Sequence, residues 1–205
     1  MISIDIEKKL RAYPEQQVLK ITAQFADGSI TKIYGPSGAG KTTFLKIIAG
    51  FVSPEKGTIR ADDVTWLDTS SKINLSPQKR KVGFVFQDYA LFPNMTVRQH
   101  LEYATDDASW IERLLAIGGL ESHSAHKPEY LSGGQQQRLA ILRALAIKPK
   151  LLLMDEPFSA LDPDMKARLL AQLKLLFNEM GTTALIVSHN AQELDGLVTG
   201  ELIVG

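Results

Sequence analysis

The sequence has 205 residues, 23 basic and 23 acidic side chains, 44% hydrophobic residues and no cysteine. This length suffices for one large domain with a sizeable core, and the zero net charge argues against nucleic-acid binding through a global positive field. The missing cysteines exclude disulfides, thiolate metal sites and cysteine nucleophiles.

The chain also lacks the sequence features of membrane insertion and secretion. No apolar run approaches the ~20 residues that cross a bilayer, and residues 1–10 do not have the basic-then-apolar order of a signal peptide. We therefore expect a soluble, cytoplasmic protein that binds no nucleic acid.

The first third of the chain is predicted to contain strands, one glycine-rich loop and one helix. Apolar residues alternate with polar ones in two segments, as in half-buried strands. Beyond the loop they recur at helical spacing up to Gly50, a typical residue after a helix end. In chain order these elements are 2–6, 19–25, 29–34, 35–40 (the loop) and 41–49, followed by a short apolar strand at 82–86.

The middle of the chain is predicted to be helical, and strands return after it. Thr96 is a suitable cap for a helix at 97–105, and Pro149 follows the end of a strong helical segment. The remaining predicted elements are helices at 108–117, 135–146 and 164–180 and strands at 151–155, 183–188 and 201–204. We therefore expect one α/β domain over 1–205, in which a helical insert (88–146) interrupts a parallel-sheet core (1–87 and 147–205).

The glycine-rich loop matches the phosphate-binding pattern G-x-x-x-x-G-K-[ST] between a strand and a helix. Glycines let backbone amides approach phosphate oxygens, and the helix N-terminus adds partial positive charge. Lys41 is expected to reach the β- and γ-phosphates of ATP and Thr42 to bind Mg²⁺. The predicted ATP-binding residues here are Gly35, Pro36, Ser37, Gly38, Ala39, Gly40, Lys41, Thr42 and Thr43.

A second acidic element follows the buried strand at 151–154. Asp155 is expected to bind Mg²⁺, as an acid at the end of a strand does in P-loop ATPases. Glu156 is expected to act as the general base for the attacking water. Taken alone, this segment is also compatible with an ordinary acidic turn.

The motif Leu131-Ser132-Gly133-Gly134-Gln135 precedes a helix and is rare in random sequences. With this motif the chain resembles the ATP-binding cassette (ABC) ATPases from about residue 1 to residue 190. The resemblance implies a P-loop NTPase core with an N-terminal antiparallel β part. It also implies a homodimer in which Leu131, Ser132, Gly133, Gly134 and Gln135 contact the ATP bound to the partner subunit.

Other residues match further elements of this family. Gln87 resembles the glutamine that contacts Mg²⁺ and the attacking water, and His189 resembles the histidine that reaches the γ-phosphate. Tyr13 lies where the family stacks an aromatic ring on adenine. The loop that communicates across the dimer is matched by Ser159, Ala160, Leu161 and Asp162.

Each of these matches has an ordinary alternative. A glutamine after a strand is usually solvated, a histidine at a strand end is usually a surface residue, and an aromatic ring often only packs. No motif supports the other three histidines, His100, His123 and His126, which we expect on the surface.

The segment Pro77–Val97 resembles the ATPase subunits of bacterial binding-protein-dependent importers, especially those for molybdate and sulfate. Importers of polyamines, iron or sugars share much of this segment. The resemblance implies a permease partner that docks near Gln87–Asn94, an indirect periplasmic binding protein, and a position on the cytoplasmic face of the inner membrane. Alternatively, the aromatic and leucine side chains of 89–92 form the small core of the insert.

The leading hypothesis is therefore an ATPase that powers a membrane importer for an oxyanion. An exporter or lipoprotein-release ATPase, a soluble cassette ATPase of DNA repair or translation, and a nucleotide switch without hydrolysis are the alternatives. The 16 residues after His189 are too few for a regulatory β-domain, so we expect no regulation by a solute-sensing tail.

Overall fold

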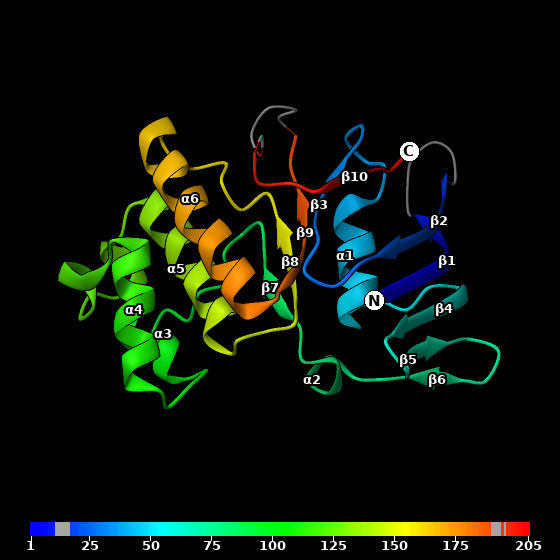
Figure 1. The fold of residues 1–205 in the computed structure, drawn as a ribbon, viewed down its shortest axis with the longest axis horizontal. Coiled ribbons are helices and arrows are strands. Elements are labelled where there is room, and N and C mark those ends of the chain that lie inside the picture. Colours follow the sequence, from blue (N-terminus) through cyan, green and yellow to red (C-terminus); the bar gives the residue numbers. More distant parts are fainter. Residues whose placement is uncertain (11–16, 190–193, 195) are drawn as a thin grey trace.

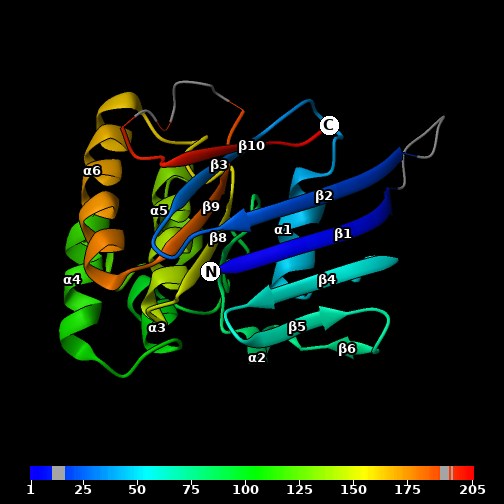
Figure 2. The ribbon, with the colours of Figure 1, turned by 45° about the vertical axis from the view of Figure 1, so that its right-hand side comes forward.

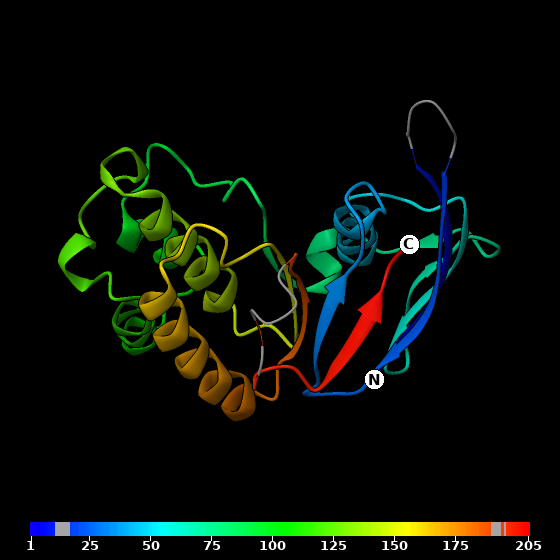
Figure 3. The ribbon, with the colours of Figure 1, turned by 90° about the horizontal axis from the view of Figure 1, so that it is seen from above.

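The computed structural model describes residues 1–10, 17–189, 194 and 196–205. Two five-stranded sheets and a group of helices form successive layers (Figure 1). Seen from above, the helix α1 (Lys41–Ala49) lies between the two sheets, and the helices α5 (Gly133–Ala146) and α6 (Pro163–Met180) cover the far face of the parallel one (Figure 3).

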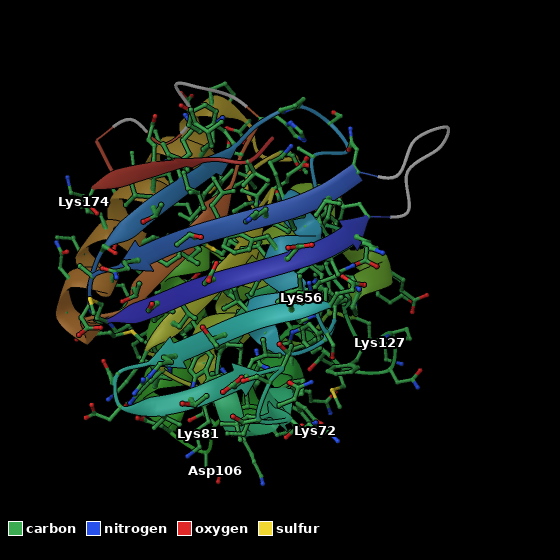
Figure 4. All side chains as sticks on the ribbon, turned by 90° about the vertical axis from the view of Figure 1, so that its right-hand side faces the viewer. Lys56, Lys72, Lys81, Asp106, Lys127 and Lys174 are labelled. Atoms are coloured by element: carbon green, nitrogen blue, oxygen red, sulfur yellow. The ribbon has the colours of Figure 1, made fainter. Side chains whose placement is uncertain are left out.

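The first sheet is antiparallel and has the strand order β2-β1-β4-β5-β6. Its inner face is apolar and its outer face is polar (Figure 4), as strand alternation requires. On the outer face, for example, the Thr22 hydroxyl donates to the Asp5 carboxylate at 2.9 Å. The strands are β1 (Ile2–Leu10), β2 (Gln17–Phe25), β4 (Lys56–Ala61), β5 (Val64–Asp68) and β6 (Ile73–Asn74).

The second sheet is parallel and has the strand order β10-β3-β9-β8-β7 (Figure 2). Its central strands are buried on both faces, as is usual for parallel sheets: Leu151 and Leu153 pack toward α1, whereas Leu152 and Met154 pack toward the outer helices. The strands are β3 (Ile30–Tyr34), β7 (Gly83–Val85), β8 (Leu151–Asp155), β9 (Thr183–Val187) and β10 (Gly200–Ile203).

The remaining helices belong mainly to the middle of the chain. They are α2 (Pro77–Arg80), α3 (Val97–Glu102), α4 (Ala108–Gly118) and the short 3₁₀ turns η1 (Glu121–His123) and η2 (Pro128–Tyr130). Helix α4 packs against both α5 and α6. Among the described residues, none forms a helix with the length and apolarity that crossing a membrane demands.

The predicted fold class is confirmed, with a parallel sheet, an N-terminal antiparallel part and inserted helices. The short strands β4, β5 and β6 were not individually predicted, because their mixed polar composition carries little periodic signal. Helix α5 begins two residues before its predicted start, since Ser132 caps it, and α3 ends three residues early at Glu102.

Candidate functional site

The glycine-rich loop connects β3 to α1, and two of its glycines are required by geometry. Gly40, directly before the helix, has φ 96°, a left-handed value that side chains disfavour. A Cβ on Gly35, where φ is 150°, would lie 1.9 Å from the Val204 carbonyl oxygen. The loop therefore runs close to the last strand of the sheet with its amides unshielded by side chains.

Lys41 is the first residue of α1 and is buried. Its Nζ donates hydrogen bonds to the carbonyl oxygens of Gly35 at 2.8 Å and Pro36 at 2.9 Å. The ammonium group is thereby folded over the loop that is predicted to hold phosphates. A positive charge at this place, added to that of the helix N-terminus, makes the loop attractive to anions.

Asp155 ends β8 and is only 2% exposed. Burial raises the pKa of its carboxyl group, and a hydrogen bond from the Thr42 hydroxyl, with the charges of Lys46 and Lys41, opposes that rise. The Oδ1 atom is buried and has no hydrogen-bond partner among the described residues. An orphaned carboxylate oxygen beside a hydroxyl fits a hard divalent cation such as Mg²⁺.

The oxygen donors at this place suit Mg²⁺ better than they suit a metal ion whose ligands all come from protein side chains. Within the described part of the chain, no group of three or more histidine, aspartate or glutamate residues is placed to hold a metal. Mg²⁺ is typically bound by one or two carboxylates, with phosphates and waters in the other positions. Thr42 and Asp155 are the residues of this chain that suit such a site.

Glu156 follows Asp155 with φ 51°, an uncommon backbone conformation for a residue with a side chain. Its N–H donates to the carbonyl oxygen of Val187 at 3.1 Å. Its Oε1 lies 2.7 Å from Nε2 of His189, which donates to it. The structure thus brings together the predicted base and the predicted γ-phosphate contact.

Gln87 leaves the sheet beside these residues, because Val85 of β7 pairs in register with Met154 of β8. Asp155 in turn pairs with Val187 of β9. The ends of β7, β8 and β9 therefore lie at one edge of the sheet, where ligands of open α/β sheets bind. Gln87 itself is exposed.

The signature residues lie at the start of α5. The Ser132 hydroxyl accepts from the Gln135 N–H at 3.3 Å, and the Gln135 side chain accepts from the Ser132 N–H at 2.8 Å, which makes a capping box. Ser132 and Gly133 are exposed, and Leu131 is buried. Among the described residues, no hydrogen bond connects the signature with the phosphate loop, so the structure does not bring these two motifs together.

The predicted communication loop joins β8 to α6. Asp162 caps α6 by accepting from the Met165 N–H at 2.9 Å, and Leu161 packs against the helical core. The Ser159 hydroxyl donates to the Glu156 carbonyl oxygen at 3.2 Å. Ala160 is exposed, and its N–H donates to the Gln137 side chain at 3.0 Å.

Gln137 contacts this loop although it belongs to none of the predicted site motifs. It is a buried polar residue, as is its neighbour Arg138, on a helix whose other buried positions are apolar. The signal was its spacing, because Ala140, Ile141 and Ala144 follow it at the three-, four- and seven-residue intervals of one helix face.

The predicted adenine contact, Tyr13, lies outside the described residues. Next to the phosphate loop is a hollow of about 570 Å³ whose wall combines aliphatic side chains with polar groups such as Gln17 and Ser37. Leu10 and Val18 of the β1–β2 hairpin and Ile203 of β10 contribute to it. Its position and lining suit a nucleotide base.

The expectation for the histidines was wrong for His100, which is fully buried. Its Nδ1 donates to the Thr96 carbonyl oxygen at 2.7 Å and its Nε2 accepts from the Phe92 N–H at 2.9 Å. His123 is half-buried, and its Nε2 accepts from the Gln135 side chain at 3.0 Å. His126 is exposed, as expected.

Comparison with known proteins identifies relatives for most of the chain. The family model described as ABC transporter matches residues 18–159. The sulfate/thiosulfate import ATP-binding protein CysA of Mesostigma viride is 41% identical over 201 residues, which cover 94% of this chain and 56% of the relative. The molybdenum import ATP-binding protein ModC of Shewanella oneidensis is 39% identical over 206 residues, which cover 100% of this chain and 56% of the relative.

The chain therefore spans a little more than half the length of these two relatives. Spermidine/putrescine and Fe(3+) import ATP-binding proteins are also similar, at 40% and 37% identity. Among solved structures, the dimeric post-hydrolysis state of the ATP-binding cassette MJ0796, bound to ADP and Pi, has a TM-score of 0.80 and 33% identity. That match covers 94% of this chain and 90% of the cassette.

Proposed function

Because the chain belongs to the ABC transporter family, we propose that it binds and hydrolyses ATP and so powers the import of a solute through a separate membrane subunit. One observation carries the proposal. The phosphate loop with Lys41, the buried Asp155 and the Glu156–His189 pair all stand at the same edge of the parallel sheet.

ATP would bind with its phosphates in the loop of residues 35–43. Lys41 would exchange its bonds to the loop carbonyls for bonds to the β- and γ-phosphates, since charge-assisted bonds to phosphate are the stronger ones. The adenine ring of ATP would enter the hollow beside Leu10 and Val18, with Tyr13 as its proposed aromatic contact.

Mg²⁺ is part of the proposal, with Thr42, Asp155 and Gln87 as the residues that would hold it or its waters. When bound, Mg²⁺ neutralises charge on the phosphates. The Asp155 carboxylate suits this task because its Oδ1 has no competing partner among the described residues.

Hydrolysis would proceed by attack of water on the γ-phosphorus. Glu156 would accept a proton from the water as the oxygen–phosphorus bond forms and the bond from phosphorus to the bridging oxygen breaks, which gives ADP and phosphate. His189 holds the Glu156 carboxylate at 2.7 Å and would turn toward the γ-phosphate once ATP is present. Gln87 would orient the same water.

We further propose a homodimer in which each signature motif completes the partner's ATP site. The exposed Ser132 and Gly133 are free to meet a second subunit, and the helix N-terminus behind them favours an anion. The communication loop, Ser159–Asp162, would lie at the same interface. The related cassette MJ0796 has a dimeric solved structure.

The permease is proposed to dock on the segment Gln87–Asn94. Phe92 is 38% exposed and lies 5.4 Å from Tyr103, measured between ring centroids, and both rings are available to an apolar partner helix. Arg143 of α5 fixes the backbone of this segment by donating to the carbonyl oxygens of Tyr89 and Ala90. The buried Val97 and Leu101 form the core beneath it, so the segment is supported from within.

The proposed cargo is an oxyanion such as molybdate or sulfate, because relatives that carry those names match the chain over nearly its full length. Under the same proposal, the permease holds the chain at the cytoplasmic face of the inner membrane. A periplasmic solute-binding protein then takes part indirectly, through the permease.

The catalytic part is tested by Glu156→Gln. We expect ATP binding to be retained and steady-state hydrolysis to fall roughly 10²-fold or more, because the general base is lost. Glu179→Gln is the matched control, since Glu179 is exposed on α6 and pairs with Arg113 far from the loop. Near-normal turnover of Glu156→Gln would remove Glu156 as the base.

The transport part is tested by affinity capture of the chain from native membranes. We expect a binding-protein-dependent permease to co-purify, and reconstituted vesicles of that complex to take up molybdate or sulfate when ATP is supplied. Capture of an exporter's membrane subunit, or uptake of putrescine in place of the oxyanions, would contradict the corresponding part of the proposal.

A further inference from the structure

Gln137 connects the helix that carries the signature motif to the segment that carries Glu156. Its Nε2 donates to the Glu156 carbonyl oxygen at 3.1 Å and to the Ser159 hydroxyl at 3.2 Å. Its Oε1 accepts from the Ala160 N–H at 3.0 Å. The Gln137 side chain is 1% exposed, and both its amide donor and its amide acceptor bind to residues 156–160.

The Glu156 residue needs such support. Its φ is 51°, and for a residue other than glycine this backbone conformation is unfavourable in free energy. It persists where the surrounding structure enforces it. The Glu156 N–H is held by Val187 of β9, and its carbonyl oxygen accepts from Gln137 of α5 and from the Ser159 hydroxyl. The direction of the Glu156 side chain toward His189 therefore depends on a contact from the sheet and on Gln137, which holds the Glu156 carbonyl oxygen and also donates to the Ser159 hydroxyl that shares it.

The exposed end of the same helix lies one turn away. Gly134 is three residues before Gln137, about 4.5 Å along a helix axis. A Cβ on Gly134 would lie 3.1 Å from the Ala160 carbonyl oxygen, so the signature also packs directly on the communication loop. Contacts within one subunit therefore connect the start of α5 to Ala160 and Glu156.

We propose that Gln137 is a positioning residue that sets the orientation of Glu156 according to the position of the signature helix. Closure of that helix on the partner's nucleotide would then align the carboxylate for hydrolysis in its own subunit. This inference rests on the proposed ATPase function and deepens it, because it makes Glu156 responsive to the neighbouring ATP site.

Gln136 offers a matched control on the same helix. Its side chain donates to the carbonyl oxygens of Pro128 at 2.9 Å and Leu131 at 3.2 Å. It therefore holds Pro128 and the first signature residue, Leu131, and within the described residues neither of these hydrogen bonds reaches Glu156 or residues 159–162. The two neighbouring glutamines differ in which loop they hold.

The experiment compares Gln137→Met with Gln136→Met in the 205-residue chain. Methionine keeps the unbranched shape and removes the hydrogen bonds. For Gln137→Met we expect kcat to fall about tenfold or more with KM for ATP changed less than about threefold, because ground-state binding is untouched. Gln136→Met is expected to keep at least about a third of the kcat, a loss of no more than about threefold.

A double-mutant cycle with Glu156→Gln separates positioning from simple packing. If Gln137 acts through the Glu156 carboxylate, adding Gln137→Met to Glu156→Gln lowers the residual single-turnover rate by less than about twofold. If Gln137 only supports packing, Gln137→Met lowers the rate by the same factor with or without Glu156→Gln. An additional tenfold loss in the double variant would therefore overturn the proposal. A Gln137→Met variant with wild-type kcat would also overturn it.

Folding is monitored by thermal unfolding, and Gln137→Glu serves as the second variant. Glutamate keeps an acceptor for the Ala160 N–H but removes the donor to the Glu156 carbonyl oxygen, so kcat should fall as for methionine. Failure of both variants to fold would show a structural role and overturn the proposal. If Glu156→Gln kept wild-type turnover, the proposed function would fail, whereas an inactive Glu156→Gln beside an active Gln137→Met would refute this inference alone.

Discussion

The two ends of the proposed ATP machinery are built in opposite ways. At the edge of the parallel sheet, Lys41 and Asp155 are buried, and Lys41 and Glu156 each have a partner in the same chain. At the start of α5, Ser132 and Gly133 are exposed, and the Ser132 hydroxyl caps its own helix.

The difference shows which parts are complete within one subunit. At the sheet edge, the proposed phosphate contact, the proposed metal contact and the proposed base all come from one subunit. The signature end has an anion-attracting helix terminus and open space in front of it. Gln137 is the contact through which the second region can influence the first.

The largest expected effect comes from the buried region. Lys41→Gln keeps a donor for the loop carbonyls but removes the positive charge, so the fold should persist while ATP hydrolysis falls roughly 10²–10³-fold. Nucleotide binding, measured by titration with a fluorescent ATP analogue, should weaken in parallel. Lys56→Gln on the antiparallel sheet (Figure 4) is the control, and an equal loss there would show that the charge at residue 41 has no special role.

Gly133→Asp should separate the two regions. A Cβ at this position has no heavy atom within 4 Å, and a carboxylate in the first turn of a helix is favourable, so the variant should fold as well as the wild type. The carboxylate would repel the partner's γ-phosphate, and we expect hydrolysis to fall about tenfold to a hundredfold. Monomer ATP binding should not change, and loss of that binding would contradict the assignment of Gly133 to the partner's site.

The sheet edge was predictable from the sequence because local patterns define it. A phosphate loop needs glycines, a lysine and a following helix in a fixed order, and β8 needs an apolar run with Asp155 at its end. The ends of parallel strands meet at one edge whatever the rest of the fold. The pairing of Glu156 with His189 follows from that arrangement.

The contacts of the helices were harder to predict because tertiary packing decides them. Gln137 and His100 stand at inward helix positions that a sequence pattern assigns to apolar residues. Most of their partners are main-chain groups, which lie 19 and 23 residues away for Gln137 and four and eight residues away for His100. Such main-chain partners have no residue-type signature. A polar residue at an apolar spacing is the one signal that marks them.

His100→Phe tests whether the helical region depends on such a contact. The Phe92 N–H loses its partner, whereas the Thr96 carbonyl oxygen keeps its bond from the His100 N–H. We expect the free energy of unfolding to fall by about 1–3 kcal/mol, with little effect on hydrolysis by the isolated chain. Denaturant unfolding measures this change. His126→Phe is the exposed control, and an equal loss there would refute a specific role of His100.

The same histidine predicts a pH dependence. Burial lowers the pKa of His100 below the usual histidine value of 6.5, so below about pH 6.5 the unfolded chain binds a proton that the folded chain does not. The contribution of His100 to stability is therefore complete above that pH and falls as the pH falls toward the folded pKa. Thermal unfolding between pH 7.5 and 5.5 should show a shallower decline in His100→Phe than in the wild type, and an identical decline would contradict the assignment.

Asp155→Asn should have the smallest effect on stability among these variants. We expect it to stabilise the nucleotide-free chain and at the same time to impair function. Burial raises the pKa of Asp155, so the ionised folded state is disfavoured, and stability decreases as the pH rises above the usual aspartate value of 3.8. Asparagine removes this cost, and we expect the nucleotide-free chain to gain about 1 kcal/mol at pH 7.5, less near pH 4, while Mg²⁺-dependent hydrolysis is lost. Asp106→Asn, on an exposed loop residue (Figure 4), should change neither quantity. A destabilised Asp155→Asn would show that the carboxylate supports the fold, whereas a gain means that its position is maintained for the ligand it binds.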